Sequence, residues 1–592
     1  MRTSRKVALT LLLAGVGLPV LAQDRPESIL PPGFGDPQPG PSATPAPRAT
    51  ASAAAGPGAT IEPPPVTDAS PVATPTPTDT PSPAALDPTT AAYYELPPFA
   101  RHGTALLGPV TAADGGLPAD AFGRADGQVI ETLMRRLTAP LPSRWLSILL
   151  RRTLLSELDT PRRTNGADFA AERAWLLLRM GESAGARAVV QGVDGGDYTP
   201  RLYQVAMNAA LANGDPAGLC PLAGAAVPAT GERGWVMAQA MCAGLGGDPA
   251  QAQALVGAAR RRGTARGIDL LLAQKVVGAG AAGRSSVTIE WAGVDRLTDW
   301  RFGLATATGV AIPEELIAAA GPQARLWQAL SPAIAAPQRL RAGEAAAAQG
   351  VLSSAALVDL YASVLDDDEA DPASQATAID LRQAYVDRSV AGRMTAIGRL
   401  WGDGARVPYA RLVLTARAAA MLPPRADEPQ VDRLIASMLT AGLDRAALRW
   451  RGVVPVGGDA WAMLALVDAD TRGPMSYGDL SSYAGSGDAG RKQRLLFAGL
   501  AGLGRLAPAD VERAATALDV RIGATNGWTA ALDRAAAAGQ AGTVVLLCAI
   551  GMQTGDWRGV PAAALYRMVG ALRAVGLEGE ARMIAAEAIA RS

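Results

Sequence analysis

The chain has 592 residues, with 55 basic and 55 acidic side chains, three cysteines and a single histidine. Its formal net charge of 0 argues against a nucleic-acid-binding protein, because such proteins carry an excess of basic residues that attracts phosphates. His102 alone cannot form a histidine-rich metal site, and the cysteines lack the close paired spacing of structural zinc sites, so we expect no metal or other cofactor.

Residues 1–22 are typical of a secretory signal peptide. Three basic residues precede an apolar run over residues 7–22, which is shorter than the roughly 20 residues that a membrane-spanning helix requires. Val20 and Ala22 place small side chains at the two positions that signal peptidase reads. We predict cleavage after Ala22 and a periplasmic protein with no stable membrane span. Secretion to the outside and an uncleaved N-terminal anchor are the alternatives.

Residues 23–92 form a tract rich in Pro, Ala, Thr and Ser. The tract contains 18 prolines and one aromatic residue, Phe34, so it has almost no apolar surface to bury. A segment of this kind cannot offset the entropy that is lost on ordering, and we expect a disordered, locally extended linker. It serves either as a passive leader or as a spacer through the cell wall.

Helical periodicity begins after Tyr93. Between Trp175 and Val190 the apolar residues recur three and four positions apart, which is typical of an amphipathic helix. This pattern predicts an all-α fold, with a helical repeat region over residues 93–283 and a C-terminal helical region over residues 351–592.

Residues 284–350 differ from both of these regions. Alternating apolar residues from Val287 to Trp291 suggest a strand, and four prolines follow between Pro313 and Pro337. Proline lacks a backbone N–H and interrupts a helix when it lies in the interior. We therefore expect an irregular connector here, and the region beyond it is either a continuation of the helical array or a separate domain.

Three glycines recur at an interval of 33 residues, at Gly181, Gly214 and Gly247. Each follows an apolar stretch, so we expect it to end one helix in positive φ, and each precedes an acidic residue that can cap the next helix. Each junction then forms the turn of a helical hairpin. The acidic residues are Glu182, Asp215 and Asp248, and the small or modest side chains five positions beyond the glycines are Ala186, Leu219 and Ala252.

This period and these turns resemble the tetratricopeptide (TPR) repeat over about residues 167–262. The resemblance implies stacked helix-turn-helix units, an α-solenoid whose curved surface receives a peptide or protein partner. The chain departs from the TPR pattern, because it lacks the Trp-Leu-Gly-Tyr signature and a closing proline at a fixed place. Related turns at Gly442 and Gly576 indicate that helical hairpins continue to the C-terminus with a less regular period.

Cys220 and Cys242 bracket a predicted hairpin turn near residues 226–231, and can face each other across two antiparallel helices. In an oxidising compartment a disulfide that closes a loop of this size stabilises by about 3 kcal/mol in the chain-entropy model. Two buried thiols on adjacent helices are the alternative. Cys548 lies in the apolar stretch VVLLCAIGM, which predicts a buried free thiol.

Gly278, Gly280 and Gly283 match the G-x-G-x-x-G spacing of a dinucleotide-binding loop, and Asp299 lies about 20 residues past its start. Such a loop follows a buried strand and opens a helix, whereas the segment before these glycines has a helical pattern. We therefore expect a flexible loop between helices.

Five acidic residues fall in one short run, where their carboxylates could bind a hard cation. The run lacks the spaced ligands of a calcium-binding loop, so we predict a solvated turn between helices. The five residues are Asp366, Asp367, Asp368, Glu369 and Asp371.

Gly551, Met552 and Gln553 partly resemble the Gly-Leu-Met-Gln motif of lytic transglycosylases, which place a catalytic module after a long helical superhelix. Such an enzyme requires an upstream glutamic acid as general acid and base. The nearest carboxylic acid is Asp533, and the Glu-Ser pair of the family's site is missing. A peptidoglycan-cleaving or peptidoglycan-associated protein is therefore an alternative.

We expect an exported, non-catalytic binding or scaffolding protein whose partner is an envelope protein or a cell-wall component. A histidine-dependent hydrolase would have to use His102, which we expect to be exposed. A structural spacer without a ligand is a further alternative. The tryptophans that could anchor a partner, although their spacing also suits a core, are Trp175, Trp235, Trp291, Trp300 and Trp327.

Overall fold

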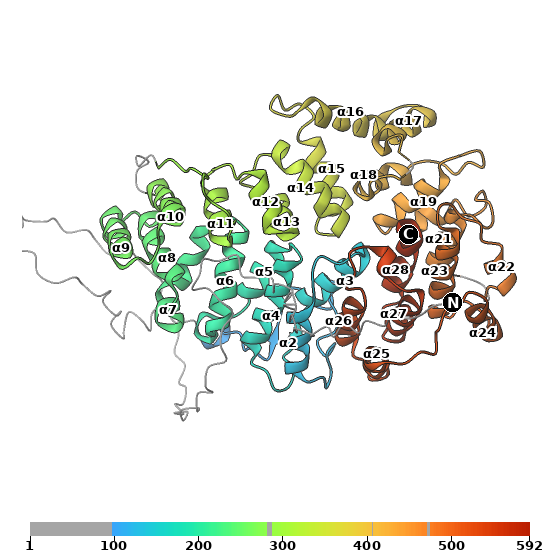
Figure 1. The fold of residues 1–592 in the computed structure, drawn as a ribbon, viewed down its shortest axis with the longest axis horizontal. Helices are drawn as coiled ribbons and strands as arrows, with labels where there is room; N and C mark the ends of the chain where they lie inside the picture. The colour runs from blue at the N-terminus through green and yellow to red at the C-terminus, as the bar shows by residue number, and fades with distance from the viewer. Residues whose placement is uncertain (1–96, 281–286, 405, 471–473) are drawn as a thin grey trace, which may run out of the picture. The chain divides into compact units, whose positions relative to one another are not determined.

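The computed structural model describes residues 97–280, 287–404, 406–470 and 474–592 (Figure 1). In these ranges most of the chain is helical, which confirms the all-α prediction, and the short strands β1 (Leu106–Leu107) and β2 (Leu158–Asp159) pair antiparallel. The predicted signal peptide and linker lie outside the described residues. The described residues from Gly103 to Ser592 form one compact unit, whereas the 3-10 helix η1 (Pro98–Ala100) belongs to a second unit.

Helices follow one another along the described chain, some through short turns and others through longer segments. Up to residue 280 they are α2 (Gly127–Arg136), α3 (Arg144–Leu155), α4 (Gly166–Arg179), α5 (Ser183–Gln191), η2 (Gly195–Asp197), α6 (Pro200–Ala212), η3 (Pro216–Leu219), α7 (Cys220–Thr230), α8 (Arg233–Leu245), α9 (Pro249–Arg262) and α10 (Gly267–Gly280). Between residues 287 and 404 they are α11 (Asp299–Ala307), α12 (Glu314–Ala320), α13 (Pro322–Leu330), α14 (Ala336–Gln349), α15 (Ser354–Ala362), α16 (Pro372–Val386) and α17 (Val390–Trp401). Thereafter they are α18 (Tyr409–Ala420), α19 (Val431–Thr440), α20 (Asp444–Leu448), α21 (Asp459–Val467), α22 (Tyr477–Ser481), α23 (Ala489–Gly502), α24 (Pro508–Ala517), α25 (Gly527–Ala537), α26 (Ala541–Gly551), η4 (Trp557–Gly559), α27 (Ala562–Ala574) and α28 (Glu578–Arg591).

Each of the three recurring glycines lies in the turn between two helices. The backbone angle φ is 86° at Gly181, 66° at Gly214 and 85° at Gly247, a conformation that costs little in a residue without Cβ. Helix α4 packs on α5, α6 on η3 and α7, and α8 on α9. The residues five positions beyond the glycines are fully buried, and they are Ala186, Leu219 and Ala252.

Two of the three acidic residues after these glycines cap the next helix. The carboxylates of Asp215 and Asp248 accept hydrogen bonds from backbone N–H groups of the first turn at 3.0 and 2.9 Å. The predicted cap at Glu182 is wrong, because its carboxylate makes no such bond and lies 3.1 Å from Nη1 of Arg151 instead. Burial raises the pKa of Glu182 to about 7, and Arg151 opposes this rise.

The prediction of an irregular connector over residues 284–350 is wrong, because α11 to α14 occupy most of it. Three of the four prolines stand at helix starts, the fourth lies in the turn between α13 and α14, and none interrupts a helix. Pro313 precedes α12, Pro322 is the first residue of α13, and Pro337 lies in the first turn of α14. In these places the missing N–H removes no helical hydrogen bond. The described residues from 287 to 291 form no strand.

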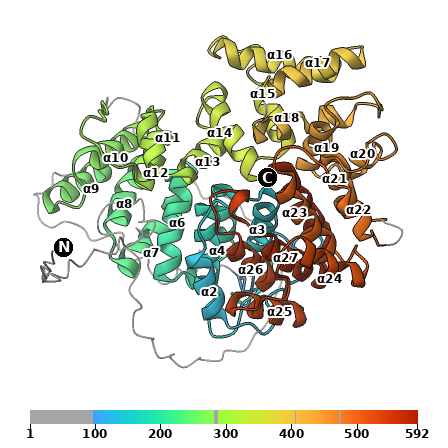
Figure 2. The same cartoon turned by 45° about the vertical axis from the view of Figure 1, so that its right-hand side comes forward.

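The C-terminal helices pack against helices from the N-terminal part of the described chain. Helix α3 contacts α26 and α28 as well as α14, and α2 contacts α26 (Figure 1, Figure 2). Residues 351–592 therefore share one unit with the helices that precede residue 283. The sequence leaves open whether the region beyond residue 350 is a separate domain, and the structure places it in the same unit.

The contact between the C-terminal helices and the N-terminal part of the described chain is centred on the N-terminus of α3. The carboxylate of Glu587 in α28 accepts hydrogen bonds from the backbone N–H of Arg144 at 2.8 Å and of Trp145 at 3.1 Å, and from the Ser143 hydroxyl at 2.6 Å. A helix N-terminus stabilises an anion through its free N–H groups and its dipole. Glu587 is 4% exposed and also pairs with Arg591 at 2.9 Å. The carboxylate is thus buried, and both of its oxygens are engaged.

The side chain of Arg144 connects this junction to two more helices. Its Nε donates to the carbonyl of Thr440 at the end of α19, at 3.1 Å, and its Nη1 donates to the carbonyls of Ala347 and Leu352 near the end of α14. Carbonyls at helix C-termini have no backbone N–H to bond, so the guanidinium satisfies them. Four helices consequently meet at one buried arginine, namely α3, α14, α19 and α28. We call this set of contacts the Arg144 junction.

Replacement of Glu587 by alanine is expected to lower the free energy of unfolding by about 3 kcal/mol, because Arg591 and the start of α3 lose a buried anion. Chemical denaturation followed by circular dichroism measures this loss. Glu580→Ala is the matched control, since Glu580 also joins α28 to α3, through Arg152 at 2.7 Å. That pair is partly exposed, with side-chain exposures of 34% and 23%, so about 1 kcal/mol or less should be lost. Equal losses would contradict the role of Glu587.

Candidate functional site

A pocket of about 930 Å³ opens among α23, α24, α27 and α28. Its volume falls within the range of roughly 300–1,000 Å³ that is usual for ligand-binding pockets. Part of its wall is apolar, and the charged side chains of two arginines and two glutamates also face it. The apolar side chains are Leu503, Leu506, Val511 and Ile522, and the polar ones are Arg505, Glu512, Tyr566, Arg573 and Glu578. We call it the C-terminal pocket.

Arg505 is fixed at the wall of this pocket by hydrogen bonds to the end of α21. Its Nη1 donates to the carbonyl oxygens of Ala465 and Leu466, each at 2.9 Å. The side chain is 8% exposed, and burial together with nearby Arg582 lowers its pKa. Its Nη2 lies 3.6 Å from the carboxylate of Glu578, the first residue of α28. The pocket therefore contains a positive charge whose position is set by the fold.

Arg573 lies across the turn that follows α23. Its Nη1 donates to the carbonyl of Leu503 at 2.9 Å. Gly504 has a φ of 69°, and a Cβ there would lie 2.1 Å from the same nitrogen, so glycine is required for this approach. The pocket is consequently lined by two arginines, two carboxylates and the phenol of Tyr566, together with apolar side chains. This arrangement suits a ligand that has charges of both signs and an apolar part.

The sequence carries no motif for this pocket, because its polar residues come from separate segments between Arg505 and Glu578. No short motif links them. Gly504 is a local signal, since it follows an apolar helical stretch as the glycines of the repeat do. That signal indicates a turn and carries no information about the helices that pack around it.

A second group of polar side chains lies buried where α21 and α23 begin. Nζ of Lys492 is 2.7 Å from the carboxylate of Asp459, and their side chains are 8% and 7% exposed. The hydroxyls of Tyr483 and Ser486 also donate to Asp459, the latter at 2.6 Å. Burial and the hydrogen bond to Asp459 raise the pKa of Tyr483. This cluster pairs its charges internally and ties a loop to two helices. Its sequence signal is Lys492, one of three lysines in the chain.

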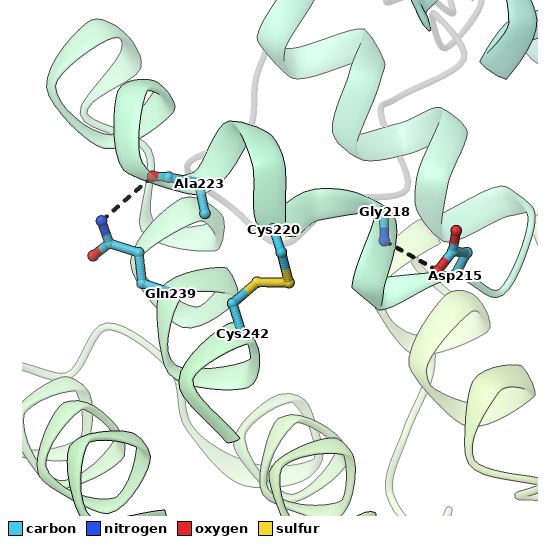
Figure 3. Close-up of a disulfide and its surroundings, with 6 residues drawn as sticks. All are labelled: Asp215, Gly218, Cys220, Ala223, Gln239 and Cys242. Carbon is cyan, nitrogen blue, oxygen red and sulfur yellow. Dashed lines mark hydrogen bonds between the residues drawn. A yellow bond between two sulfur atoms is a disulfide. The ribbon is translucent and has the colours of Figure 1, made fainter. Parts of the chain in front are cut away.

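Cys220 and Cys242 are joined by a disulfide, with an S–S distance of 2.09 Å and a Cα–Cα distance of 5.4 Å (Figure 3). The pair is the one that the sequence predicts. It links the first residue of α7 to α8, and a hydrogen bond from Gln239 to the carbonyl of Ala223 at 3.4 Å links the same two helices (Figure 3). The disulfide adjoins a second hydrophobic core, which is built from α6 to α11 around Trp235.

The glycine-rich motif lies partly in a helix and partly outside the described residues. Gly278 and Gly280 belong to the last turn of α10, so the predicted loop is wrong there, and Gly283 lies outside the described residues. A Cβ on Gly280 would lie 2.4 Å from the carbonyl oxygen of Gly244 in α8, so the glycine allows two helices to approach closely. Asp299 is the first residue of α11 and is 1% exposed. Burial raises its pKa well above the usual range.

The acidic run forms an exposed turn between α15 and α16. Its last residue, Asp371, caps α16 by accepting hydrogen bonds from the backbone N–H groups of Ala373 and Ser374, each at 3.0 Å. The Ser374 hydroxyl also donates to Asp371 and lowers its pKa. Among the described residues, no group of three or more His, Cys, Asp or Glu side chains is placed to hold a metal ion.

The residues that resemble the lytic transglycosylase motif make contacts within the protein. The amide of Gln553 pairs with the backbone of Thr138, accepting from its N–H at 2.6 Å and donating to its carbonyl at 3.0 Å. Met552 is fully buried. Asp533 is an exposed residue whose carboxylate lies 3.1 Å from Nη1 of Arg567.

Three of the five tryptophans considered as anchors belong to the core. Trp235, Trp300 and Trp327 are 0%, 3% and 3% exposed, so they cannot reach a partner at the surface. Trp175 and Trp291 are partly buried. Of the other candidates, Cys548 is fully buried with a raised thiol pKa caused by burial, and His102 is exposed.

Comparison with protein-family models gives no match, and neither the curated proteins nor the solved structures yield a similar protein. In the part of the chain that the structure describes, no helix combines the length and apolar character needed to cross a membrane.

Asp299→Asn is expected to make stability less dependent on pH. Because burial raises the folded-state pKa of Asp299, the folded wild type holds a proton that the unfolded chain releases, and its stability falls as pH rises above the usual aspartate pKa. In thermal melts from about pH 4 to about pH 8, the melting temperature of the variant should rise relative to that of the wild type as pH increases. Asp295→Asn, at an exposed position, is the control and should show no such trend. A difference in melting temperature between variant and wild type that does not change with pH would refute the raised pKa of Asp299.

Removal of the disulfide in a Cys220→Ala/Cys242→Ala variant is expected to lower the free energy of unfolding by about 3 kcal/mol, since the unfolded chain regains the freedom of the closed loop. Hydrogen exchange should locate the loss of protection in α7 to α10, beside the second core. Reductant should produce the same change in the wild type and none in the variant. A wild type that is insensitive to reductant would contradict the prediction.

Proposed function

We propose that the chain is an exported, non-catalytic helical-repeat protein that binds an envelope protein or a cell-wall component. The observation that carries this proposal is the C-terminal pocket, where two positioned arginines and two carboxylates stand beside an apolar wall. Peptides and peptide-bearing wall components combine charged and apolar groups in the same way. The hairpins of α4 to α9 and their TPR-like period support a binding role for the molecule as a whole.

Export is supported by two independent features. The first 22 residues have the layout of a signal peptide. The disulfide between Cys220 and Cys242 is of a kind that persists in oxidising compartments such as the periplasm.

The pocket is suited to binding because its two arginines are already in position. Arg505 is held by two carbonyls of α21 and Arg573 by the carbonyl of Leu503. Side chains that are ordered before a ligand arrives lose less entropy on binding. The site therefore needs little rearrangement to receive a charged partner.

Peptidoglycan cleavage is the weaker proposal. In lytic transglycosylases the Gly-Leu-Met-Gln motif belongs to a catalytic module, whereas the Gln553 amide here is engaged by the backbone of Thr138. Asp533 is an exposed residue that is paired with Arg567 at the surface.

Binding can be tested with protein recovered from the periplasmic fraction, where a chain that begins at Gln23 is expected by mass. Co-sedimentation with insoluble peptidoglycan sacculi should retain the wild type. Glu512→Arg changes the charge of the pocket at an exposed residue and should weaken retention by about tenfold. Release of soluble muropeptides is scored in parallel, and none is expected.

Glu315→Arg makes the same substitution at an exposed position of α12, and it should leave retention unchanged. Equal weakening by both variants would show that the pocket is not the site. Muropeptide release that Asp533→Ala abolishes would support the enzyme instead. Absence of retention would exclude the wall as ligand, and crosslinking in envelope extract with the same two variants would then separate a protein partner from a spacer without a ligand.

A further inference from the structure

Four exposed arginines surround the turn between α9 and α10. Arg260, Arg261 and Arg262 end α9, and Arg266 precedes the first residue of α10. In the described part of the chain no ion pair engages any of the four. We call this group the α9 arginine patch.

The turn that carries the patch is well defined. Gly263 has a φ of 67°, and its N–H donates to the carbonyls of Ala259 and Arg260, which closes the C-terminus of α9. A Cβ on Gly263 would lie 2.7 Å from Nη2 of Arg266, so this side chain folds across the turn. The turn therefore brings the four arginines to one corner between α9 and α10.

Nearby negative charge does not neutralise the patch. Asp269 in α10 is engaged by Arg301, whose Nε and Nη2 lie 2.7 and 3.2 Å from its two carboxylate oxygens. Because the whole chain has a formal net charge of 0, the excess of positive charge here is local. Such a local field attracts an anionic partner over about a Debye length, roughly 10 Å at moderate salt.

We infer that the α9 arginine patch docks the protein onto a bilayer surface that contains anionic phospholipids. Exposed arginines at a helix end suit a plane of phosphate headgroups, whereas a single small anion is held by donors that converge in a recess. Leu271, an apolar side chain that is 37% exposed, lies in the second turn of α10, five residues after Arg266. An exposed apolar side chain within a few residues of arginines favours a lipid interface over a soluble anionic polymer.

The test is flotation of the chain, as recovered from cells, with vesicles of phosphatidylcholine alone or mixed with phosphatidylglycerol in equal parts. Wild-type protein should bind the anionic vesicles, should bind less at high salt, and should not bind phosphatidylcholine. Replacement of all four patch arginines by alanine should weaken binding by at least about tenfold. Because the four residues are exposed, the variant should keep the wild-type melting temperature.

The matched control replaces four exposed arginines elsewhere by alanine and changes the net charge equally. These are Arg382, Arg388, Arg521 and Arg534. Equal loss in the control would overturn the inference, because binding would then follow net charge alone. Retained binding in the patch variant, or binding to soluble polyphosphate with no binding to anionic vesicles, would also overturn it. Loss confined to the patch variant would support it, and Leu271→Ser should then weaken vesicle binding further than polyphosphate binding.

Discussion

The buried carboxylate of Glu587 is the constraint on which the closed arrangement of helices depends. A charge that is removed from water must be matched by hydrogen-bond donors, and here they come from the start of α3 and from Arg591. Ser143 and Glu587 are separated by 444 residues, so these partners meet only when both ends of the described chain are folded. Arg144 adds the ends of α14 and α19 to the same junction.

The local part of this fold could be predicted from the sequence. The all-α class and the disulfide pair were predicted, and Gly181, Gly214 and Gly247 stand in turns, because glycine, helical periodicity and cysteine spacing act over a few residues. The closure could not be predicted. Arg144 and Glu587 look like ordinary charged residues in a chain with 55 of each sign, and nothing near them in sequence shows that both are buried.

The predictions that the structure contradicts fail for the same reason, because they depend on contacts between residues far apart in the sequence. Pro313 and Pro337 suggested an interrupted segment because a proline either ends or begins a helix, and the choice depends on how the residues after it pack. Glu182 suggested a cap, but a buried carboxylate near a guanidinium binds the stronger donor, and Arg151 comes from another helix. The C-terminal pocket was missed for this reason too, since its residues become neighbours only after α23, α24, α27 and α28 have packed.

The junction and the pocket are connected through a single helix. Glu578 begins α28 at the wall of the pocket, and Glu587 lies nine residues further along the same helix, about 14 Å away at the usual rise per residue. Because α28 is rigid and packs on α3, α21, α23 and α27, fixing one end fixes the other. The hydrogen bonds that hold Glu587 at the start of α3 therefore also place Glu578 opposite Arg505. A pocket built from residues beyond 468 thus owes its geometry to a contact with residues 143–145, so a C-terminal fragment without α3 would lack this restraint on the pocket.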